Sequence, residues 1–456
     1  MAMYTRDLAR HLAEGRTVDV ALVGAGRFGT AVAAQLGQMR RQGVRLAVVC
    51  DLRPDNAREA LRAAGYADDQ IVEATAPGMV GDALRAGQGA LTTDPLVAAH
   101  APVDAAIEIT GVPHVAALVV SEALAHGTHV VNVTVEADIL LGAYFARLAE
   151  ANGVVYSVAD GDQPGVTRRL IEWAQSLGYR IVAAGRGTRF YPFDAEGQPE
   201  EAFARYGYSA ELTERRRFNP QMYNSFRDGS KAQIEMTSLA NMTGLVPDVR
   251  GMHQPSAGTH DLARLFCPQE YGGLLAREGV VELANAVAPD GESDVDREIA
   301  NGVFVVVGTD NAILGEDIAF WGLPGHAGRF AALYRPYHLC GIETPLSVLD
   351  AVLYGRATGA PLPVPTAECV TIAKRDLTAG ETLDGSGGKT VVGMIERAAV
   401  ARAGDLLPLG LAYNVRVTRD LPRGRGADVW RCGARCVGAV GAAAAGAGCE
   451  VLSAEC

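Results

Sequence analysis

The first third of the chain alternates apolar, strand-like runs with helical segments. After a short amphipathic opening, "VDVALVGAGRFGTAVAAQLGQM" has the pattern of an apolar strand, a glycine turn and an alanine-rich helix. Further strands are predicted in "VRLAVVCD", "VDAAIEITG" and "THVVNVTVEAD", and the helical segment "VPHVAALVVSEALAHG" separates the last two. Such alternation is typical of an α/β fold in which helices cover a parallel sheet. We therefore predict a doubly wound, Rossmann-type domain over residues 1–155.

The glycine turn predicts a dinucleotide-binding loop. Gly24 would make the tight turn, Gly26 would let the backbone approach a pyrophosphate, and Gly29 would let the helix pack closely on the strand. Arg27 and Phe28 lie at the start of that helix, whose N-terminus would face the phosphates. A glycine motif alone is a weak signal, but here it has a strand before it, a helix after it and an acid at the end of the next strand.

Four further residues are predicted to contact the cofactor. Asp51 ends the second strand, where a carboxylate binds the ribose hydroxyls of NADH and repels the extra phosphate of NADPH. Arg53 lies two residues further on and favours NADPH, so the choice between NADPH and NADH stays open. Thr110 and Gly111 follow a strand at the carboxyl edge of the sheet and would border the nicotinamide, unless they form a plain strand-to-helix turn.

The rest of the chain divides into three further regions. Residues 156–337 have a looser pattern that predicts an inserted mixed α+β domain, and residues 338–360 are predicted to pack back on the nucleotide domain. The Pro- and Gly-rich "GRATGAPLPVPTAE" is typical of a linker, and the short strands and turn signals up to residue 431 predict a small β domain over 361–431. Residues 432–456 form a low-complexity tail rich in Ala, Gly and Cys.

The segment "NSFRDGSKAQIEM" carries an unusual polar row. If it is one helix, Asn224, Asp228, Lys231 and Glu235 fall on one side of it. A solvated helix face with weak ion pairs is the simple interpretation. The scarcity of charge in the following "AQIEMTSLANMTGLVP" instead favours a buried helix whose polar row faces a substrate. In that case Lys231 would bind the reacting oxygen, and Asp228 and Glu235 suit Mg²⁺ or Mn²⁺.

Two shorter motifs carry further candidates for substrate binding. "GDQPG" places Asp162 and Gln163 in a turn before a helix, which is typical of a helix cap as often as of a site. "GRGTRF" places Arg186 and Arg189 after a strand, where they would suit a phosphate or a carboxylate, although a surface turn fits equally well.

Composition narrows the classes of partner. A net charge of −12 and a pI near 5.3 argue against nucleic acid and anionic membranes, so a small-molecule substrate is expected. The opening residues lack a signal-peptide core and no apolar run is long enough to span a bilayer, which predicts a cytoplasmic protein. The eight cysteines lack compact zinc-ligand spacing, so free thiols and no structural metal are expected.

Several long blocks together resemble a known family. "VALVGAGRFG", "VNVTVEAD", "GDQPG", "AAGRGTRFYP", "FNPQMYNSFRDGSKAQIEM", "YRPYHLCGIE" and "TIAKRDLTAGETLDGSGGKTVVG" are similar to homoserine-dehydrogenase-like oxidoreductases with a C-terminal SAF domain. The resemblance spans roughly residues 15 to 430 and implies a catalytic middle domain that forms a homodimer, followed by a β-clip domain.

One branch of that family implies a specific activity. This branch resembles 1-deoxy-D-xylulose 5-phosphate reductoisomerase, which makes 2-C-methyl-D-erythritol 4-phosphate with NADPH and a divalent cation, and it implies a phosphorylated keto-sugar as substrate. Two alternatives remain because one fold serves many reactions. The first is a simple dehydrogenase of a small hydroxy or sugar acid, and the second is an NAD-sensing regulatory protein.

Overall fold

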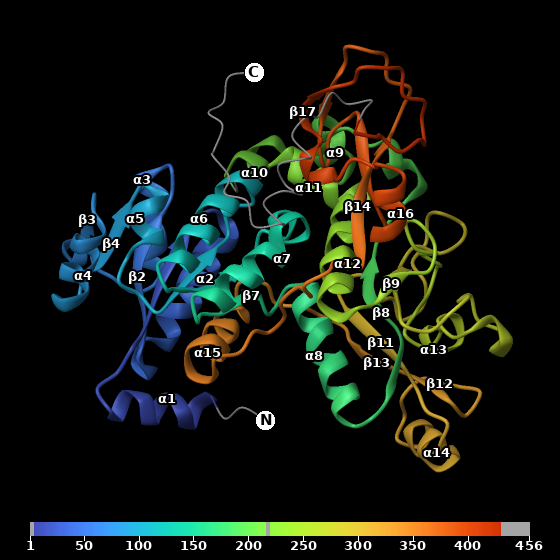
Figure 1. The fold of residues 1–456 in the computed structure, drawn as a ribbon, viewed down its shortest axis with the longest axis horizontal. Helices are drawn as coiled ribbons and strands as arrows, with labels where there is room; N and C mark the ends of the chain where they lie inside the picture. Colours follow the sequence, from blue (N-terminus) through green and yellow to red (C-terminus); the bar gives the residue numbers. More distant parts are fainter. Residues whose placement is uncertain (1–3, 216–218, 430–456) are drawn as a thin grey trace.

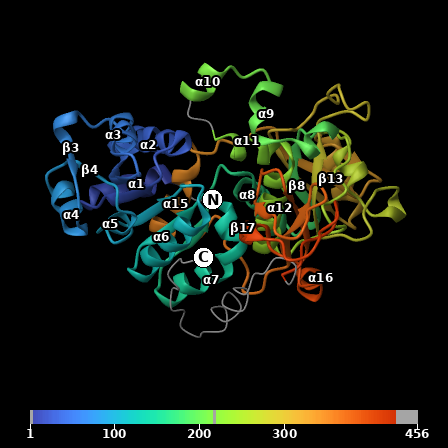
Figure 2. The same ribbon diagram turned by 90° about the horizontal axis from the view of Figure 1, so that it is seen from above.

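A computed structural model describes residues 4–215 and 219–429 of the chain. The predicted tail, 432–456, lies outside the described residues. Figure 1 shows the N-terminal domain at one end of the molecule and the middle and C-terminal domains at the other, and Figure 2 shows the same separation from above. No helix of the described residues is long and apolar enough to cross a membrane.

The N-terminal domain contains a parallel sheet of seven strands, in the order β3-β4-β2-β1-β5-β6-β7. Every pair of neighbouring strands is parallel, as the alternating pattern predicted. The strands are β1 (Val18–Val23), β2 (Val44–Cys50), β3 (Ile71–Glu73), β4 (Gly89–Thr92), β5 (Ala105–Glu108), β6 (His129–Asn132) and β7 (Tyr156–Val158). Because helices cover both faces, the central strands are continuous apolar runs. β7 carries this domain past the predicted boundary at residue 155.

The helices of this domain follow the strands. They are α1 (Tyr4–Ala13), α2 (Arg27–Met39), α3 (Pro54–Ala63), α4 (Pro77–Arg85), α5 (Pro95–Ala99), α6 (Pro113–Ala125) and α7 (Val135–Ala151). Near the other end of the chain, α15 (Thr344–Tyr354) returns to the same sheet, where Val348 and Leu349 are buried in its core.

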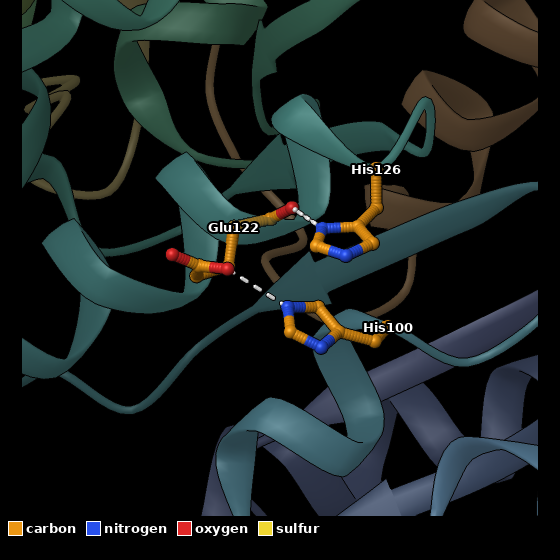
Figure 3. A group of neighbouring side chains, drawn as sticks. All are labelled: His100, Glu122 and His126. Atoms are coloured by element: carbon orange, nitrogen blue, oxygen red, sulfur yellow. Dashed lines mark hydrogen bonds and ion pairs between the residues drawn. The ribbon is translucent and has the colours of Figure 1, made fainter.

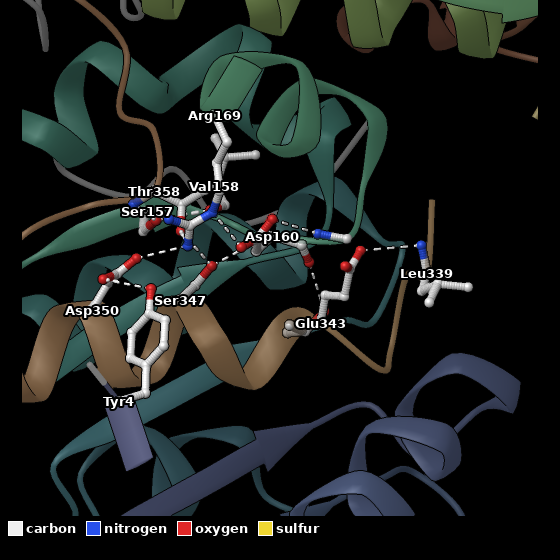
Figure 4. Close-up of polar contacts among 12 residues, drawn as sticks. Tyr4, Ser157, Val158, Asp160, Arg169, Leu339, Glu343, Ser347, Asp350 and Thr358 are labelled. Atoms are coloured by element: carbon white, nitrogen blue, oxygen red, sulfur yellow. Dashed lines mark hydrogen bonds and ion pairs between the residues drawn. The ribbon is translucent and has the colours of Figure 1, made fainter. Parts of the chain in front are cut away.

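A polar network fixes α15 in that place (Figure 4). Arg169 donates to Asp160 just after β7 and, over 2.7 Å, to Asp350 on α15. Tyr4 of the opening helix donates to the same Asp350 over 3.0 Å. Burial raises the pKa of Asp160, and the guanidinium of Arg169 opposes that rise. Hydrogen bonds and ion pairs therefore connect the opening helix, the residue just after β7 and α15, which are far apart in the sequence.

The middle domain contains a mixed sheet in the order β12-β13-β11-β8-β10-β9. Its strands are β8 (Arg180–Thr188), β9 (Val246–Pro247), β10 (Val280–Asn285), β11 (Val303–Gly308), β12 (Gly325–His326) and β13 (Phe330–Arg335). Its helices are α8 (Gln163–Ser176), α9 (Pro199–Arg205), α10 (Ala210–Arg215), α11 (Pro220–Arg227), α12 (Ser230–Thr243), α13 (Leu262–Leu265) and α14 (Ala312–Phe320). The order of the strands in the two sheets confirms the fold class predicted from the sequence, a Rossmann-type domain with a separate mixed α+β domain.

The C-terminal domain contains two small antiparallel pairs, β14 with β16 and β15 with β17. Their bounds, with the adjoining helix, are β14 (Ala367–Ala373), β15 (Thr382–Asp384), β16 (Val391–Arg397), α16 (Ala398–Ala403) and β17 (Tyr413–Arg416). Short 3-10 turns elsewhere in the chain are Arg40–Gln42, Asp68–Gln70, Pro192–Glu196, Gln269–Tyr271 and Leu409–Leu411. Helix α12 lies beside β14 in Figure 1 and packs against α7, α8, β10 and β16, so all three domains meet around it.

The prediction of one helix through the polar row is wrong. Helix α11 ends at Arg227, and α12 begins at Ser230. Between them Gly229 has a φ of +88°, which a residue with a side chain rarely adopts. Asp228 accepts a hydrogen bond from the backbone N–H of Ser230 at 2.9 Å, so its carboxylate satisfies the first N–H group of the second helix. The row is therefore split between two helices.

Candidate active site

The glycine turn has the shape that the sequence predicts. Gly24 has a φ of +107°, and a Cβ there would lie 2.8 Å from the carbonyl oxygen of Ile109. A Cβ on Gly29 would lie 2.0 Å from the carbonyl oxygen of Gly24, so the helix is packed on the strand. A Cβ on Gly26 would meet no atom within 4 Å. The open space at Gly26 and the exposed start of α2, with Arg27 and Phe28, fit a bound pyrophosphate.

Asp51 holds this loop. Its carboxylate accepts hydrogen bonds from the backbone N–H groups of Ala25 and Arg53, both at 2.9 Å, and from the side chain of Asn56 at 3.1 Å. Asp51 is half-buried and Arg53 is exposed. These positions fit the predicted contact of Asp51 with a ribose, and they leave the preference between NADH and NADPH as a prediction.

The turn after β5 lies beside the glycine turn. Thr110 N–H donates to Glu108 at 2.9 Å, and Gly111 N–H donates to the hydroxyl of Thr134 at 3.0 Å. Glu108 is fully buried, and its Oε2 has no hydrogen-bond partner among the described residues. Burial raises the pKa of this carboxyl. Because β1 and β5 are neighbours, Thr110 and Gly111 border the edge that holds the glycine turn, which is where such sheets bind ligands.

Lys231 connects the middle domain to this edge. Its ammonium donates to Glu136 of α7 at 2.7 Å, and both side chains are buried. Burial acts to lower the pKa of Lys231, but the carboxylates of Glu136, Glu235 and Asp162 together hold it above its usual value. Lys231 is therefore a fixed cation at the junction of two domains.

A second buried cation lies close by. Arg186 on β8 forms an ion pair with Glu235, and both are nearly inaccessible to solvent. When the side-chain amide of Gln163 is oriented with its oxygen towards Arg186, that oxygen accepts hydrogen bonds from the two terminal nitrogens of Arg186 at 3.3 and 3.2 Å. In the same orientation its amide nitrogen donates to Asp162 at 3.0 Å. The imidazole of His338 lies 3.2 Å from this amide, and its Nδ1 is 2.8 Å from the carbonyl of Asn301.

Asp162 is a buried carboxyl of this cluster whose pKa is raised above its usual value. Its carboxylate accepts from the backbone N–H of Gln163 at 3.0 Å at the start of α8. Burial and the nearby Glu235 raise its pKa to about 7, although Lys231 opposes the rise. A general acid or base works best when its pKa lies near the operating pH. Asp162 is therefore both the predicted helix cap and a candidate proton donor.

The structure brings together five of the predicted residues and separates three. Lys231, Glu235, Asp162, Gln163 and Arg186 form one buried cluster. Asp228 forms a buried ion pair with Lys374 of the C-terminal domain at 2.6 Å, and Asn224 donates to the carbonyls of Gly197 and Gly387. Arg189 pairs with Asp294 and Glu298 nearer the surface.

The two predicted metal ligands, Asp228 and Glu235, are each paired with a different basic side chain. Asp228 is neutralised by Lys374, and Glu235 is neutralised by Arg186. Within the described part of the chain, the group of His, Cys, Asp and Glu side chains that is close enough to hold an ion is elsewhere, at His100, Glu122 and His126. A divalent cation at Asp228 and Glu235 therefore has no support from this geometry.

Two buried carboxylates near the candidate site, Glu108 and Glu136, were not among the residues predicted from the sequence. Each lies at or just after the carboxyl end of a strand, in "AAIEITG" and "VNVTVEAD". Ligands bind to such sheets at the carboxyl ends of the strands. This rule indicated Thr110 and Gly111, and it applies equally to these two acids. What the sequence did not reveal is that Glu136 reaches a lysine that is 95 residues away in the sequence.

Comparison with known proteins supports an enzyme of the oxidoreductase class. The family model described as "Oxidoreductase DRL, catalytic domain" matches residues 161–344, which is the middle domain with the first residue of α15. No curated protein matches the chain.

Solved dehydrogenase structures match parts of the chain with low TM-scores. Apo scyllo-inositol dehydrogenase from Lactobacillus casei is 14% identical with a TM-score of 0.28, and the match covers 38% of this chain and only 46% of that one. The same enzyme with bound NAD(H) and scyllo-inositol is 12% identical with a TM-score of 0.35, over 70% and 76% of the two chains. A myo-inositol dehydrogenase from Corynebacterium glutamicum ATCC 13032 is 11% identical with a TM-score of 0.37, over 74% and 89%.

At these identities and TM-scores the structural similarities carry no argument about fold, activity or substrate. The match of the middle domain to an oxidoreductase catalytic domain, together with the Rossmann-type sheet, confirms the prediction of an NAD(P)-dependent oxidoreductase at the level of enzyme class.

Proposed function

We propose that this protein interconverts a carbonyl and an alcohol on a small polyhydroxylated substrate with a nicotinamide cofactor. The observation that carries the proposal is the buried cluster of Lys231 and Asp162, held by Glu136 at the edge of the sheet where the glycine turn lies. A fixed ammonium and a carboxyl with a pKa of about 7 are the two groups that a carbonyl reduction needs from the protein.

The proposed roles follow from the charge states. Lys231 binds and polarises the reacting oxygen, since a cation stabilises the negative charge that develops there. Asp162 gives a proton to that oxygen during reduction and takes it back during oxidation. Gly24, Gly26, Gly29 and Asp51 would hold the cofactor, which supplies or accepts the hydride when bound.

The finer proposal concerns the substrate. The sequence blocks that resemble the reductoisomerase branch support an enzyme that converts 1-deoxy-D-xylulose 5-phosphate to 2-C-methyl-D-erythritol 4-phosphate, a reaction for which the same resemblance implies a divalent cation. The charge balance of the cluster argues against a phosphate dianion and so favours the alternative, a simple dehydrogenase of a small hydroxy or sugar acid, whose carboxylate carries a single negative charge. Lys231 and Arg186 are each paired with a carboxylate, so the cluster has no surplus positive charge for a phosphate dianion.

The test is turnover with defined substrates. The purified protein is incubated with 1-deoxy-D-xylulose 5-phosphate, with and without Mg²⁺ or Mn²⁺, and oxidation of NADPH or NADH is followed by absorbance. Formation of the branched polyol phosphate supports the reductoisomerase. Reduction of NAD⁺ or NADP⁺ by hydroxy acids or polyols, without rearrangement, supports the simple dehydrogenase. Cofactor binding without any turnover over a broad substrate panel would favour the regulatory alternative.

A further inference from the structure

A cluster of three side chains lies on the N-terminal domain, away from the candidate active site (Figure 3). Glu122 and His126 belong to the end of α6, and His100 follows α5. Helix α6 begins beside Gly111 at the carboxyl edge of the sheet, so its last turn lies at the opposite edge. The cluster is therefore separate from the proposed chemistry.

We propose that His100, Glu122 and His126 bind one divalent transition-metal ion of the zinc class. One ligand atom from each residue lies within 4.8 Å of the other two. Two imidazoles and one carboxylate form a donor set that zinc accepts, with water as the fourth ligand. Glu122 and His126 are four residues apart on one helical face, which is the spacing at which two side chains reach one ion.

Hydrogen bonds set the proton positions that ligation needs. Nδ1 of His126 lies 2.9 Å from the carbonyl oxygen of Glu122. A carbonyl only accepts, so Nδ1 carries the proton, and in the neutral ring Nε2 keeps a free lone pair. Such a bond from the second ring nitrogen to a carbonyl is the usual support of a metal-binding histidine.

His100 and Glu122 are already in contact. Nε2 of His100 lies 2.8 Å from Oε2 of Glu122. When the ring of His100 is neutral and protonated at Nε2, a metal ion that binds at Nε2 displaces that proton, and the ring is then protonated at Nδ1. The two rings are stacked with centroids 3.6 Å apart and planes 25° apart, so one of them has to rotate for both lone pairs to meet at one ion. Ligand atoms around tetrahedral zinc lie about 3.4 Å apart. Partial exposure of the side chains permits the shift.

Local charge favours a cation in this position. The C-terminal end of α6 carries the negative end of the helix dipole, and the carboxylate of Glu122 adds to it. A bound ion would also join the ends of α5 and α6.

The experiment is a titration of the full chain with Zn²⁺ after its accessible thiols have been alkylated, which removes competition from cysteines. One Zn²⁺ per chain is expected in the wild type, and His126→Ala and Glu122→Gln should each weaken that binding by tenfold or more. His114→Ala is the matched control, because His114 is an exposed histidine at the other end of α6.

Co²⁺ gives an independent readout. Binding at this cluster should give the visible absorption of a nitrogen and oxygen ligand set without a thiolate charge-transfer band. Equal Zn²⁺ binding by the wild type and His126→Ala, or no binding by the wild type, would overturn the proposal and leave the cluster as a histidine–glutamate ion pair.

Discussion

Lys231 is surrounded by carboxylates that determine its charge. Because Glu136, Glu235 and Asp162 hold its pKa above the usual value in spite of burial, its amine stays charged at working pH. A permanently charged ammonium binds an oxygen but does not remove a proton. That division of roles leaves proton transfer to Asp162.

Replacing Lys231 with methionine should reduce turnover by roughly 10² or more, the effect of losing one charge-stabilising group. It should also lower the stability by about 3–5 kcal/mol, because Glu136 is left buried without its partner. Kinetics and thermal unfolding measure the two effects. The double variant Lys231→Met/Glu136→Gln should recover stability and remain inactive. Recovery of activity as well would mean that the pair is only structural.

The raised pKa of Asp162 predicts that the stability of the folded protein decreases as the pH rises. Its folded pKa of about 7 lies above the ordinary value of 3.8, so the folded state holds a proton that the unfolded state releases. The stabilising contribution is present in full below about pH 4 and is lost as the pH rises through about 7. Thermal unfolding between pH 4 and 8 should show this decline in the wild type and a weaker one in Asp162→Asn.

The same protonation should control the reaction. Reduction of a carbonyl needs the protonated acid, so kcat/KM for reduction should fall above about pH 7, and the oxidation rate should rise there. An unchanged pH profile in Asp162→Asn would exclude this residue as the proton donor.

The glycine turn and α2 form the element that should hold the cofactor. Gly26→Val should abolish binding of NADH and NADPH, because its side chain would enter the space proposed for the pyrophosphate. The fold should survive, since a Cβ at Gly26 meets no protein atom within 4 Å. Fluorescence titration and circular dichroism measure the two properties. Wild-type affinity in a folded Gly26→Val protein would refute the cofactor site.

A buried ion pair between Asp228 and Lys374 lies at the break between α11 and α12. Lys374→Met leaves Asp228 buried without a partner, so stability should fall by about 3–5 kcal/mol. Lys389→Met is the control, because Lys389 pairs with Glu200 on the surface, so its loss should leave stability close to that of the wild type. Chemical denaturation of both variants tests the difference. Equal effects would mean that Lys374 is not needed to hold the break.

Some elements were predictable from local pattern, and others depend on contacts that pattern does not encode. Strand β1, the glycine turn and α2 follow from a continuous apolar run and three glycines, since each is decided within a short window of sequence. The polar row was misassigned because helical spacing was assumed across Gly229, which has a left-handed conformation. Which carboxylate meets Lys231 and which meets Lys374 depends on packing between domains, and no local pattern contains that information.

At the scale of the whole molecule, α14 and the residue after it carry exposed apolar side chains. Ile313, Phe320 and Trp321 are each more than 70% exposed. The family resemblance implies a homodimer through the middle domain, and this patch is where we expect a second copy to bind. Light scattering should therefore give twice the mass of one chain. Phe320→Ser/Trp321→Ser should shift the protein towards monomer, whereas a wild-type monomer at micromolar concentration would contradict the prediction.

The C-terminal domain is connected to the rest of the protein by side chains that belong to the middle domain. Gln221 donates to the carbonyls of Asp384 and Ser386, Asn224 donates to Gly387, and Gln233 accepts from Ile395. Asp228 contributes the buried ion pair with Lys374. The polar groups on these two helices are therefore satisfied by a domain that follows them by more than a hundred residues.

This dependence has an evolutionary consequence. Loss of the C-terminal domain by recombination would remove, in one step, hydrogen bonds or an ion pair from four polar side chains on and between α11 and α12, at Gln221, Asn224, Asp228 and Gln233. These interactions contribute to stability, so such a shortened gene product would be selected against unless those positions changed together. We therefore expect the two domains to be inherited as one unit, and relatives that lack the third domain to carry apolar or differently paired residues at all four positions.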